Sequence, residues 1–210
     1  MFLANQAGID IFATGGIGGV HRDAIEPHNP SFDISADLTE LSKTPVMVVS
    51  AGIKSILDIP KTIEYLETFH VPVLAYKTNE LPSFYSKNSG ITVPKIESAR
   101  HAARLLENHK LNLNQEAGIL MTVPPPVLNT IDMDTIQSAV NEALKSAAKD
   151  RIVGKDFTPY VLGKVKEYSD GQSVKLNLKL VENNIEKACK ISIEYSEIRS
   201  KSVEKIKSSD

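Results

Sequence analysis

The stretch that decides the fold is residues 45–76, which read PVMVVSAGIKSILDIPKTIEYLETFHVPVLAY. It opens with a nearly continuous apolar run, Pro45 to Ser50, and closes with a second one, Val71 to Tyr76. Runs of this length are typical of strands that are buried on both faces. Between them, from Ile56 to Phe69, apolar residues recur at roughly helical spacing. The order strand, helix, strand predicts a βαβ unit.

The same alternation continues on both sides of this unit. The residues before Asp10 resemble the end of an amphipathic helix that runs into a strand. We predict strands at Asp10–Thr14 and Gly118–Val123, and helices at Glu97–Leu111, Met133–Ala148, Pro159–Tyr168 and Val174–Glu197. The pattern indicates an α/β protein with one large domain over residues 1–198. Residues 199–210 are expected to form a polar, solvated tail.

Composition excludes several classes of partner. The chain has 24 Lys and Arg against 26 Asp and Glu, so no net basic field is present to hold nucleic acid or an anionic membrane. No apolar stretch approaches the roughly 18 residues that span a bilayer, and the start of the chain lacks the pattern of a secretory signal. The single cysteine, Cys189, excludes an internal disulfide framework and a cysteine-based zinc site. We expect a cytoplasmic protein.

The first candidate motif is the segment Thr14–Arg22, TGGIGGVHR, which follows a predicted strand. Four glycines in five positions let the backbone adopt positive φ and approach an anion, and His21 and Arg22 add donors beside it. The spacing matches neither a dinucleotide fingerprint nor a P-loop. A tight turn against neighbouring backbone, with His21 as a hydrogen-bonded structural residue, explains the same residues.

The second candidate is the segment Asp33–Leu38, DISADL, at the entry of a predicted helix. Asp33 and Asp37 offer the oxygen ligands that Mg²⁺ or Mn²⁺ prefers, and Ser35 offers a hydroxyl to a substrate. The alternative is a helix cap, because Asp37 is followed three residues later by Glu40.

The third candidate is Lys54, which lies between the Pro45–Ser50 strand and a helix that Ser55 and Asp58 are expected to cap. A lysine near the positive end of a helix dipole is disfavoured in its charged form, and a neutral amine is the nucleophile that Schiff-base chemistry needs. An exposed lysine in a turn is the alternative.

Four segments together resemble one known family. They are ATGGIGGVHR (residues 13–22), residues 32–76, NELPSFYSKNSG (residues 79–90) and GKDFTPYVL (residues 154–162). In order and spacing they resemble the pseudouridine-5′-phosphate glycosidases, also called indigoidine synthase A-like proteins, and the resemblance runs from about residue 7 to about residue 190. It implies an α/β/α layered fold, a homotrimer, and a manganese-dependent enzyme. That enzyme reversibly splits the carbon–carbon glycosidic bond of pseudouridine 5′-phosphate, giving uracil and ribose 5-phosphate through a lysine imine.

The resemblance also implies a role for particular residues. Lys54 matches the nucleophile, and Asp33 matches the residue that holds the metal through its water shell. Asn177 matches a late active-site asparagine. The implied catalytic residues are Lys54, Asp37, Asn177 and His21, and the implied substrate contacts are Thr14, Ser35, Ala36 and Asp37.

The chain also departs from the family pattern. Family members begin with a further segment that supplies a proton-donating glutamate and a phosphate-binding lysine, so we expect an N-terminally truncated relative. An insertion from Asp23 to Pro30 is expected to affect the metal site, and Val123–Pro126 stands where the family often has an Asn-Pro pair. A catalytically impaired remnant that binds sugar phosphate or joins a full-length paralogue is the alternative. Aldolase chemistry would explain Lys54 and the glycines but not the whole resemblance.

Overall fold

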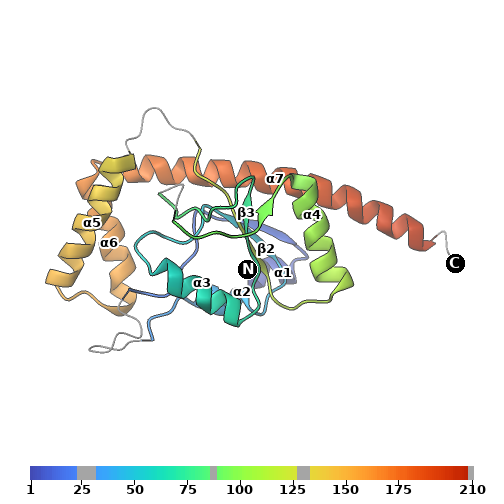
Figure 1. The fold of residues 1–210 in the computed structure, drawn as a ribbon, viewed down its shortest axis with the longest axis horizontal. Coiled ribbons are helices and arrows are strands. Elements are labelled where there is room, and N and C mark those ends of the chain that lie inside the picture. Colours follow the sequence, from blue (N-terminus) through green and yellow to red (C-terminus); the bar gives the residue numbers. More distant parts are fainter. Residues whose placement is uncertain (23–31, 86–88, 127–132, 208–210) are drawn as a thin grey trace.

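The computed structural model of the 210-residue protein describes residues 1–22, 32–85, 89–126 and 133–207. Over these residues, five parallel strands form one sheet with the order β1-β2-β5-β3-β4. Figure 1 labels β2 and β3 in the middle of the molecule, with helices around them. The strands are β1 (Ile11–Ala13), β2 (Met47–Ser50), β3 (Val73–Tyr76), β4 (Lys95–Ile96) and β5 (Ile119–Thr122). The predicted strands are confirmed, and each begins one or two residues later than expected. The short edge strand β4 was not predicted.

The central strands carry the core. Every residue of β2, β3 and β5 is buried, as the continuous apolar runs predicted, whereas the edge strand β1 is half-buried. Side chains alternate between the two faces of the sheet. Met47 and Val49 belong to one hydrophobic cluster, and Val48 belongs to the other. The sheet is therefore covered on both faces.

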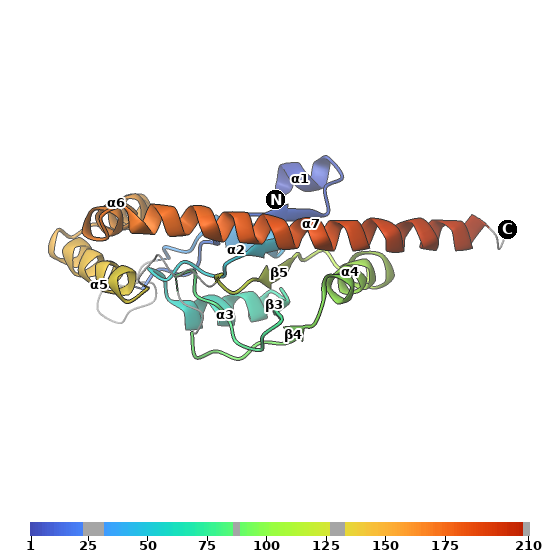
Figure 2. The same ribbon diagram turned by 90° about the horizontal axis from the view of Figure 1, so that it is seen from above.

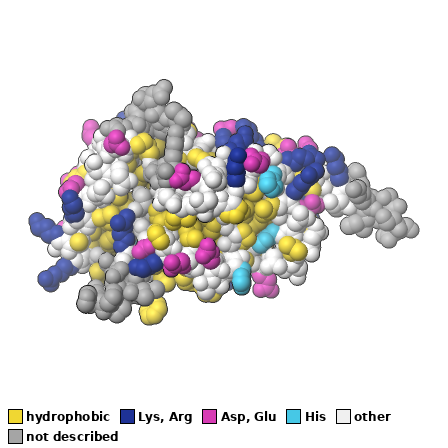
Figure 3. Space-filling view, viewed as in Figure 1, with side chains coloured by type: hydrophobic (Ala, Val, Ile, Leu, Met, Phe, Trp, Pro, Cys, Tyr) yellow, Lys and Arg dark blue, Asp and Glu magenta, His cyan; other side chains and the backbone are white. Residues whose placement is uncertain are grey.

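Helices form the outer layers. They are α1 (Phe2–Gln6), α2 (Ala36–Leu41), α3 (Ile59–Thr68), α4 (Ala99–Glu107), α5 (Met133–Lys149), α6 (Phe157–Tyr168) and α7 (Gln172–Lys207). In Figure 2, α4 and α7 lie together, α5 and α6 pair at one end of the molecule, and α7 runs past the sheet along the length of the protein. This arrangement confirms the layered α/β fold. Figure 3 shows hydrophobic side chains gathered along the middle of one face and charged side chains around its margin.

Helix α3 begins three residues after the predicted Ile56. Asp58 caps it, because its Oδ1 accepts a hydrogen bond from the Lys61 amide at 3.0 Å, and a proline at the first turn needs no amide partner. Helix α4 begins after the cap Ser98, and its last predicted turn is a π-helical segment, Asn108–Asn112.

The described part of the expected polar tail is helical. Residues 199–207 form the last turns of α7. Ser202 Oγ donates a hydrogen bond to Glu107 Oε1 at 2.7 Å, and Ile198 packs against the core cluster beneath α4. These contacts with α4 are long-range, so local polarity did not predict them. The domain boundary at residue 198 stays a prediction. In the described part of the chain, no helix combines the length and hydrophobicity needed to cross a membrane.

Candidate active site

The three candidate motifs meet beside the carboxyl ends of β1 and β2. We call residues 14–20 the glycine loop, residues 32–37 the aspartate loop and residues 51–58 the lysine loop. The glycine loop follows β1, the lysine loop follows β2, and the aspartate loop leads into α2. Single bridges join Val20 of the glycine loop to both Ile34 and Asp58. The carboxyl edge of a parallel sheet is where open α/β proteins bind ligands.

Backbone hydrogen bonds extend the pairing of β1 and β2 into their loops. The Ala51 amide donates to Gly15 O at 2.8 Å, and the Ile17 amide donates to Gly52 O at 3.0 Å. The Lys54 amide then donates to Ile17 O at 3.2 Å. The backbone of Lys54 is thus held directly by the glycine loop.

The glycines of this loop serve close packing rather than unusual backbone conformation. None of the four has a positive φ, so that part of the prediction is wrong. A Cβ on Gly16 would overlap the Phe84 ring, and a Cβ on Gly18 would overlap the Ser35 hydroxyl. A Cβ on Gly19 would lie 2.5 Å from Thr62 Oγ1. The loop is glycine-rich because other segments press against it.

The aspartate loop is locked to the glycine loop. The Ser35 amide donates to Gly19 O at 3.0 Å, and Ser35 Oγ caps α2 by accepting from the Asp37 amide at 3.3 Å. The Asp37 carboxylate accepts from the Gly18 amide at 2.8 Å. The predicted Asp37–Glu40 cap is therefore wrong. Glu40 instead accepts from Thr44 Oγ1, and this hydrogen bond lowers the pKa of the Glu40 carboxyl.

His21, which directly follows the glycine loop, pairs with Asp33 of the aspartate loop. The His21 amide donates to Asp33 O at 3.0 Å, and His21 Nδ1 lies 3.2 Å from Asp33 Oδ2. The imidazole is 13% exposed and packs edge-on against Phe157, with ring centroids 5.2 Å apart. His21 is therefore held on one side by a carboxylate and on the other by an aromatic ring.

The described carboxylates suit only a lightly coordinated metal. Among described residues, no group of three or more His, Cys, Asp or Glu gathers to hold a metal ion. The Asp33 side chain is 30% exposed, while Asp37 already binds the Gly18 amide. Mg²⁺ and similar hard cations keep several waters and often bind through one or two carboxylates. Asp33 fits such an ion, and the predicted insertion from Asp23 to Pro30 lies outside the described residues.

Lys54 is half-buried. The backbone turns directly after it, because the Lys54 carbonyl accepts a hydrogen bond from the Leu57 amide at 3.0 Å. No described residue forms an ion pair with its ammonium group. The predicted double cap of α3 is half right: Asp58 caps the helix, whereas Ser55 Oγ is buried without a hydrogen-bond partner. Lys54 precedes Ile59, the first residue of α3, by five positions and so lies outside the first turn of that helix.

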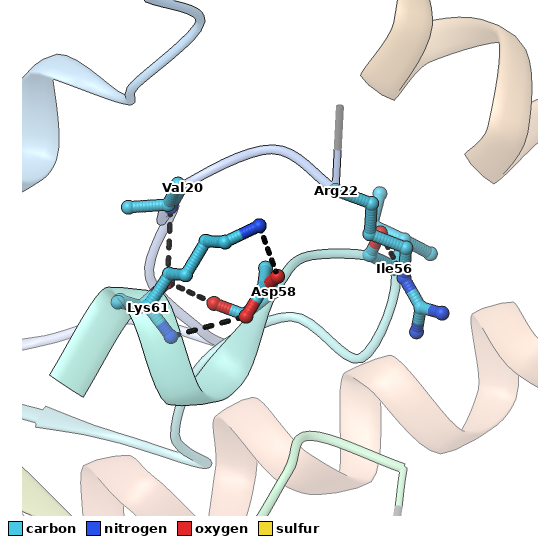
Figure 4. Close-up of polar contacts among 6 residues, drawn as sticks. Val20, Arg22, Ile56, Asp58 and Lys61 are labelled. Atoms are coloured by element: carbon cyan, nitrogen blue, oxygen red, sulfur yellow. Dashed lines mark hydrogen bonds and ion pairs between the residues drawn. The ribbon is translucent and has the colours of Figure 1, made fainter. Parts of the chain in front are cut away.

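Arg22 supports the lysine loop (Figure 4). Its Nε donates to Ile56 O at 3.2 Å, and its Nη2 donates to Ser55 O at 3.0 Å. In the same view the Asp58 amide donates to Val20 O at 2.9 Å. The guanidinium was expected to offer donors to an anion, but these donors are used to join two loops.

Phe84 was not singled out by its residue type, and it touches both loops. Its amide donates to Ala51 O at 2.9 Å, and its ring packs over Gly16 and against Tyr85, with ring centroids 4.6 Å apart. Its φ of 58° is left-handed, which is a strained conformation for a bulky residue. Burial raises the pKa of the neighbouring Tyr85 to about 12.

Helix α7 brings asparagines to the same loops. Asn177 is exposed, and its Oδ1 lies 3.0 Å from the position of a Cβ on Gly15. Asn184 was missed: its Nδ2 donates to Thr14 O at 2.8 Å and to Gly15 O at 3.1 Å. The available signal was a polar residue in line with the buried Leu176, Leu180 and Ala188 of α7. The structure thus brings the sequence-predicted residues into one region, and their roles stay predictions.

Comparison with known proteins shows the family to which the chain belongs. The family model of indigoidine synthase A like protein matches residues 1–194. The chain belongs to this family. Family relatives named pseudouridine-5′-phosphate glycosidase include one from Brachyspira hyodysenteriae, 50% identical over 200 residues, and one from Arabidopsis thaliana, 44% identical over 199 residues. Each match covers 94% of this chain but only 63% and 59% of the respective relative.

Two solved structures share the fold. The prealnumycin C-glycosynthase AlnA, solved in complex with ribulose 5-phosphate, has a TM-score of 0.85 and 34% identity, over 95% of this chain and 65% of its own. An indigoidine synthase A-like protein from Thermotoga maritima has a TM-score of 0.78 and 37% identity, over 92% of this chain and 62% of its own. The chain therefore spans somewhat less than two thirds of the length of these curated relatives and solved structures.

Proposed function

We propose that this chain forms the imine-forming part of a pseudouridine-5′-phosphate glycosidase. The enzyme would reversibly cleave the carbon–carbon bond between C1′ of the sugar and the uracil ring, giving uracil and ribose 5-phosphate. The observation that carries the proposal is Lys54, a half-buried lysine without an ion-pair partner among the described residues and with its backbone bonded to the glycine loop. The curated relatives bear this enzyme's name.

The chemistry requires an electron sink. An ordinary glycosidase protonates an oxygen leaving group between two carboxylates, but here the leaving atom is a ring carbon. In the synthetic direction, Lys54 Nζ attacks the C1′ aldehyde of open-chain ribose 5-phosphate and water leaves, forming an imine. The uracil carbon then adds to C1′, the electron pair of the C=N bond moves to nitrogen, and the uracil ring carbon loses its proton. The O4′ hydroxyl of the sugar next displaces the Lys54 amine from C1′ and passes its proton to that amine, which closes the ribose ring and frees Lys54. Cleavage runs the same steps in reverse.

The surrounding residues supply binding and orientation. Ser35 and Ala36 lie where the aspartate loop contacts the glycine loop, and Thr14 begins the glycine loop. In our proposal the sugar phosphate binds to these three residues. Asp37 stabilises this crossing through the Gly18 amide. His21 Nδ1 faces Asp33, so Nε2 would be the nitrogen that contacts the substrate. Asn177, which is exposed beside Gly15, would hydrogen-bond the substrate.

A divalent cation, Mn²⁺ in our proposal, would be held by Asp33 together with water and would offset the negative charge of the phosphate. The resemblance also supports a homotrimer in the cytoplasm as the form in which the longer family members act. Because these members are longer than the chain, the proposal covers only the part of the active site that residues 1–210 build.

Borohydride trapping tests the role of Lys54 separately from turnover. We expect ribose 5-phosphate and borohydride to leave one reduced sugar phosphate on the wild-type chain, seen as a mass increase of the intact protein. Lys54→Ala should abolish the adduct, whereas Lys43→Ala, which removes an exposed lysine at the end of α2, should keep it. An adduct that persists in Lys54→Ala would refute the assignment. Release of uracil from pseudouridine 5′-phosphate then tests the complete reaction.

The metal assignment has its own test. Asp33→Asn should raise the Mn²⁺ concentration needed for half-maximal turnover or binding, while borohydride trapping at Lys54 continues. Asp37→Asn is the matched control, because it removes a carboxylate that binds the Gly18 amide. Equal Mn²⁺ affinity in wild type and Asp33→Asn, measured by titration calorimetry, would contradict the assignment.

A further inference from the structure

Asn184 makes a buried polar contact that packing does not require. Its side chain is fully buried in α7, on the same face as the apolar Leu180, Ala188 and Ile191. The amide Nδ2 donates to Thr14 O and Gly15 O, which lie 170 and 169 positions earlier in the chain. The amide Oδ1 is buried and has no hydrogen-bond partner.

This arrangement costs stability. A buried polar atom without a hydrogen-bond partner lowers the stability of the fold, and a leucine of similar size would continue the apolar line of the helix. Residues that break a local packing rule are expected at functional or strained sites. The hydrogen bonds to the glycine loop are the feature of Asn184 that an apolar residue could not replace.

We propose that Asn184 is a positioning residue that holds Thr14 and Gly15 in the conformation that binds the sugar phosphate. This inference rests on the proposed function. Asn184 acts through the loop, because its buried amide reaches the Thr14 and Gly15 carbonyls and not the open edge of the site.

Backbone hydrogen bonds connect the loop residues that Asn184 holds to Lys54, the proposed nucleophile. Gly15 O also accepts from the Ala51 amide, which begins the row of bonds that ends with the Lys54 amide on Ile17 O. Asn177, seven residues earlier on α7, lies beside the same Gly15. Helix α7 thus contributes two asparagines to one loop: a buried one that fixes it and an exposed one that can face the ligand.

The neighbouring Asn183 offers a comparison within the same helix. Its Nδ2 donates to Pro124 O at 3.1 Å and so supports the segment after β5, not the glycine loop. Ile191, two helical turns beyond Asn184, is equally buried and makes no polar contact. Ile191→Val therefore controls for a general loss of stability, and Asn183→Leu controls for the loss of an amide anchor elsewhere.

The test measures ribose 5-phosphate affinity by calorimetry with Mn²⁺, together with hydrogen exchange of the full chain. Asn184→Leu should weaken binding by about tenfold or more, because one lost buried hydrogen bond is sufficient for that change. The amides of Ile17 and Gly18 should exchange faster. Ile191→Val should keep the affinity and the exchange pattern, and Asn183→Leu should leave the glycine-loop amides protected.

The outcomes separate this inference from the proposed function. If wild type binds ribose 5-phosphate and Asn184→Leu binds it equally well, the role of Asn184 is refuted and the proposed function stands. If folded wild type does not bind it, the proposed function fails and the inference fails with it. Asn184→Ser, which leaves room for water, decides the matter if the leucine variant does not fold. Failure of both variants to fold would show that Asn184 serves folding and would overturn the positioning role.

Discussion

The glycines of the loop after β1 and the glycines of the outer turns meet different physical demands. Gly15, Gly16, Gly18 and Gly19 have no positive φ, yet a Cβ on each would crowd a side chain from a distant segment. The turn glycines have the opposite properties, with positive φ and open space around them: Gly8, Gly90, Gly154 and Gly171. In the glycine loop, crowded glycines therefore mark where distant segments converge, whereas these open glycines lie in turns and connecting segments. Sequence alone shows only glycine in both places.

Gly52 in the lysine loop combines both demands, so its substitution should have the largest effect. Its φ is 93°, and a Cβ there would overlap the Pro82 carbonyl oxygen, which belongs to the backbone and cannot rotate away. We expect Gly52→Ala to lower the free energy of unfolding by about 3 kcal/mol or more. Urea unfolding followed by circular dichroism measures it. The control Gly90→Ala, with φ of 77° and open surroundings, should cost only about 1 kcal/mol. Equal losses would contradict the distinction.

Gly16→Ala tests crowding without backbone strain. The new methyl group would overlap the buried Phe84 ring, which Tyr85 confines on another side. Overpacking of this kind should lower the free energy of unfolding by about 2 kcal/mol. In a Phe84→Ala background the same substitution should cost less, by about 1 kcal/mol or more, since the two sites are in contact. Strict additivity in a double-mutant cycle would show that the ring is not the obstacle.

Local sequence patterns were sufficient to predict the buried strands and the place of Lys54 in the fold. The apolar runs of β2, β3 and β5 identified the buried strands, because such runs are stable only inside a covered sheet. The position of Lys54 after β2 placed it at the carboxyl edge of the sheet. The resemblance of the chain to its family then predicted that Lys54 is the nucleophile, and this role stays a prediction.

Contacts between distant segments were not predictable in this way. Arg22 was expected to face an anion, but its donors are taken by the carbonyls of Ser55 and Ile56, more than thirty positions away. For Asn184 the local signal was only that a polar residue stands between the buried apolar residues Leu180 and Ala188 of α7. The C-terminal part of α7 contacts α4, which supplies Glu107 as the hydrogen-bond acceptor of Ser202. These features follow from tertiary packing, which overrides local propensity.

Gly171→Ala tests backbone conformation without crowding. Gly171 lies between α6 and α7 with φ of 73° and nothing within 4 Å of a Cβ. Alanine should lower the free energy of unfolding by about 1 kcal/mol, because the left-handed backbone at position 171 is the only source of strain. Gly171→Asn should cost less, since asparagine tolerates this conformation better than alanine. Thermal unfolding of the three proteins measures the order. If asparagine destabilises more than alanine, crowding and not φ would be the cause.

Gly163→Ala should have the smallest effect and the opposite sign. Gly163 lies inside α6, and it is the glycine of this chain that has neither a positive φ nor an atom within 4 Å of a Cβ. Alanine at such a position should stabilise the protein by about 0.5–1 kcal/mol, because the unfolded chain loses freedom and the helix keeps its bonds. Ribose 5-phosphate affinity should not change, since the core contacts of α6 come from its neighbours Val161 and Val165. Stabilisation here together with destabilisation at Gly16 would show that the environment of each glycine, and not the substitution itself, sets the sign.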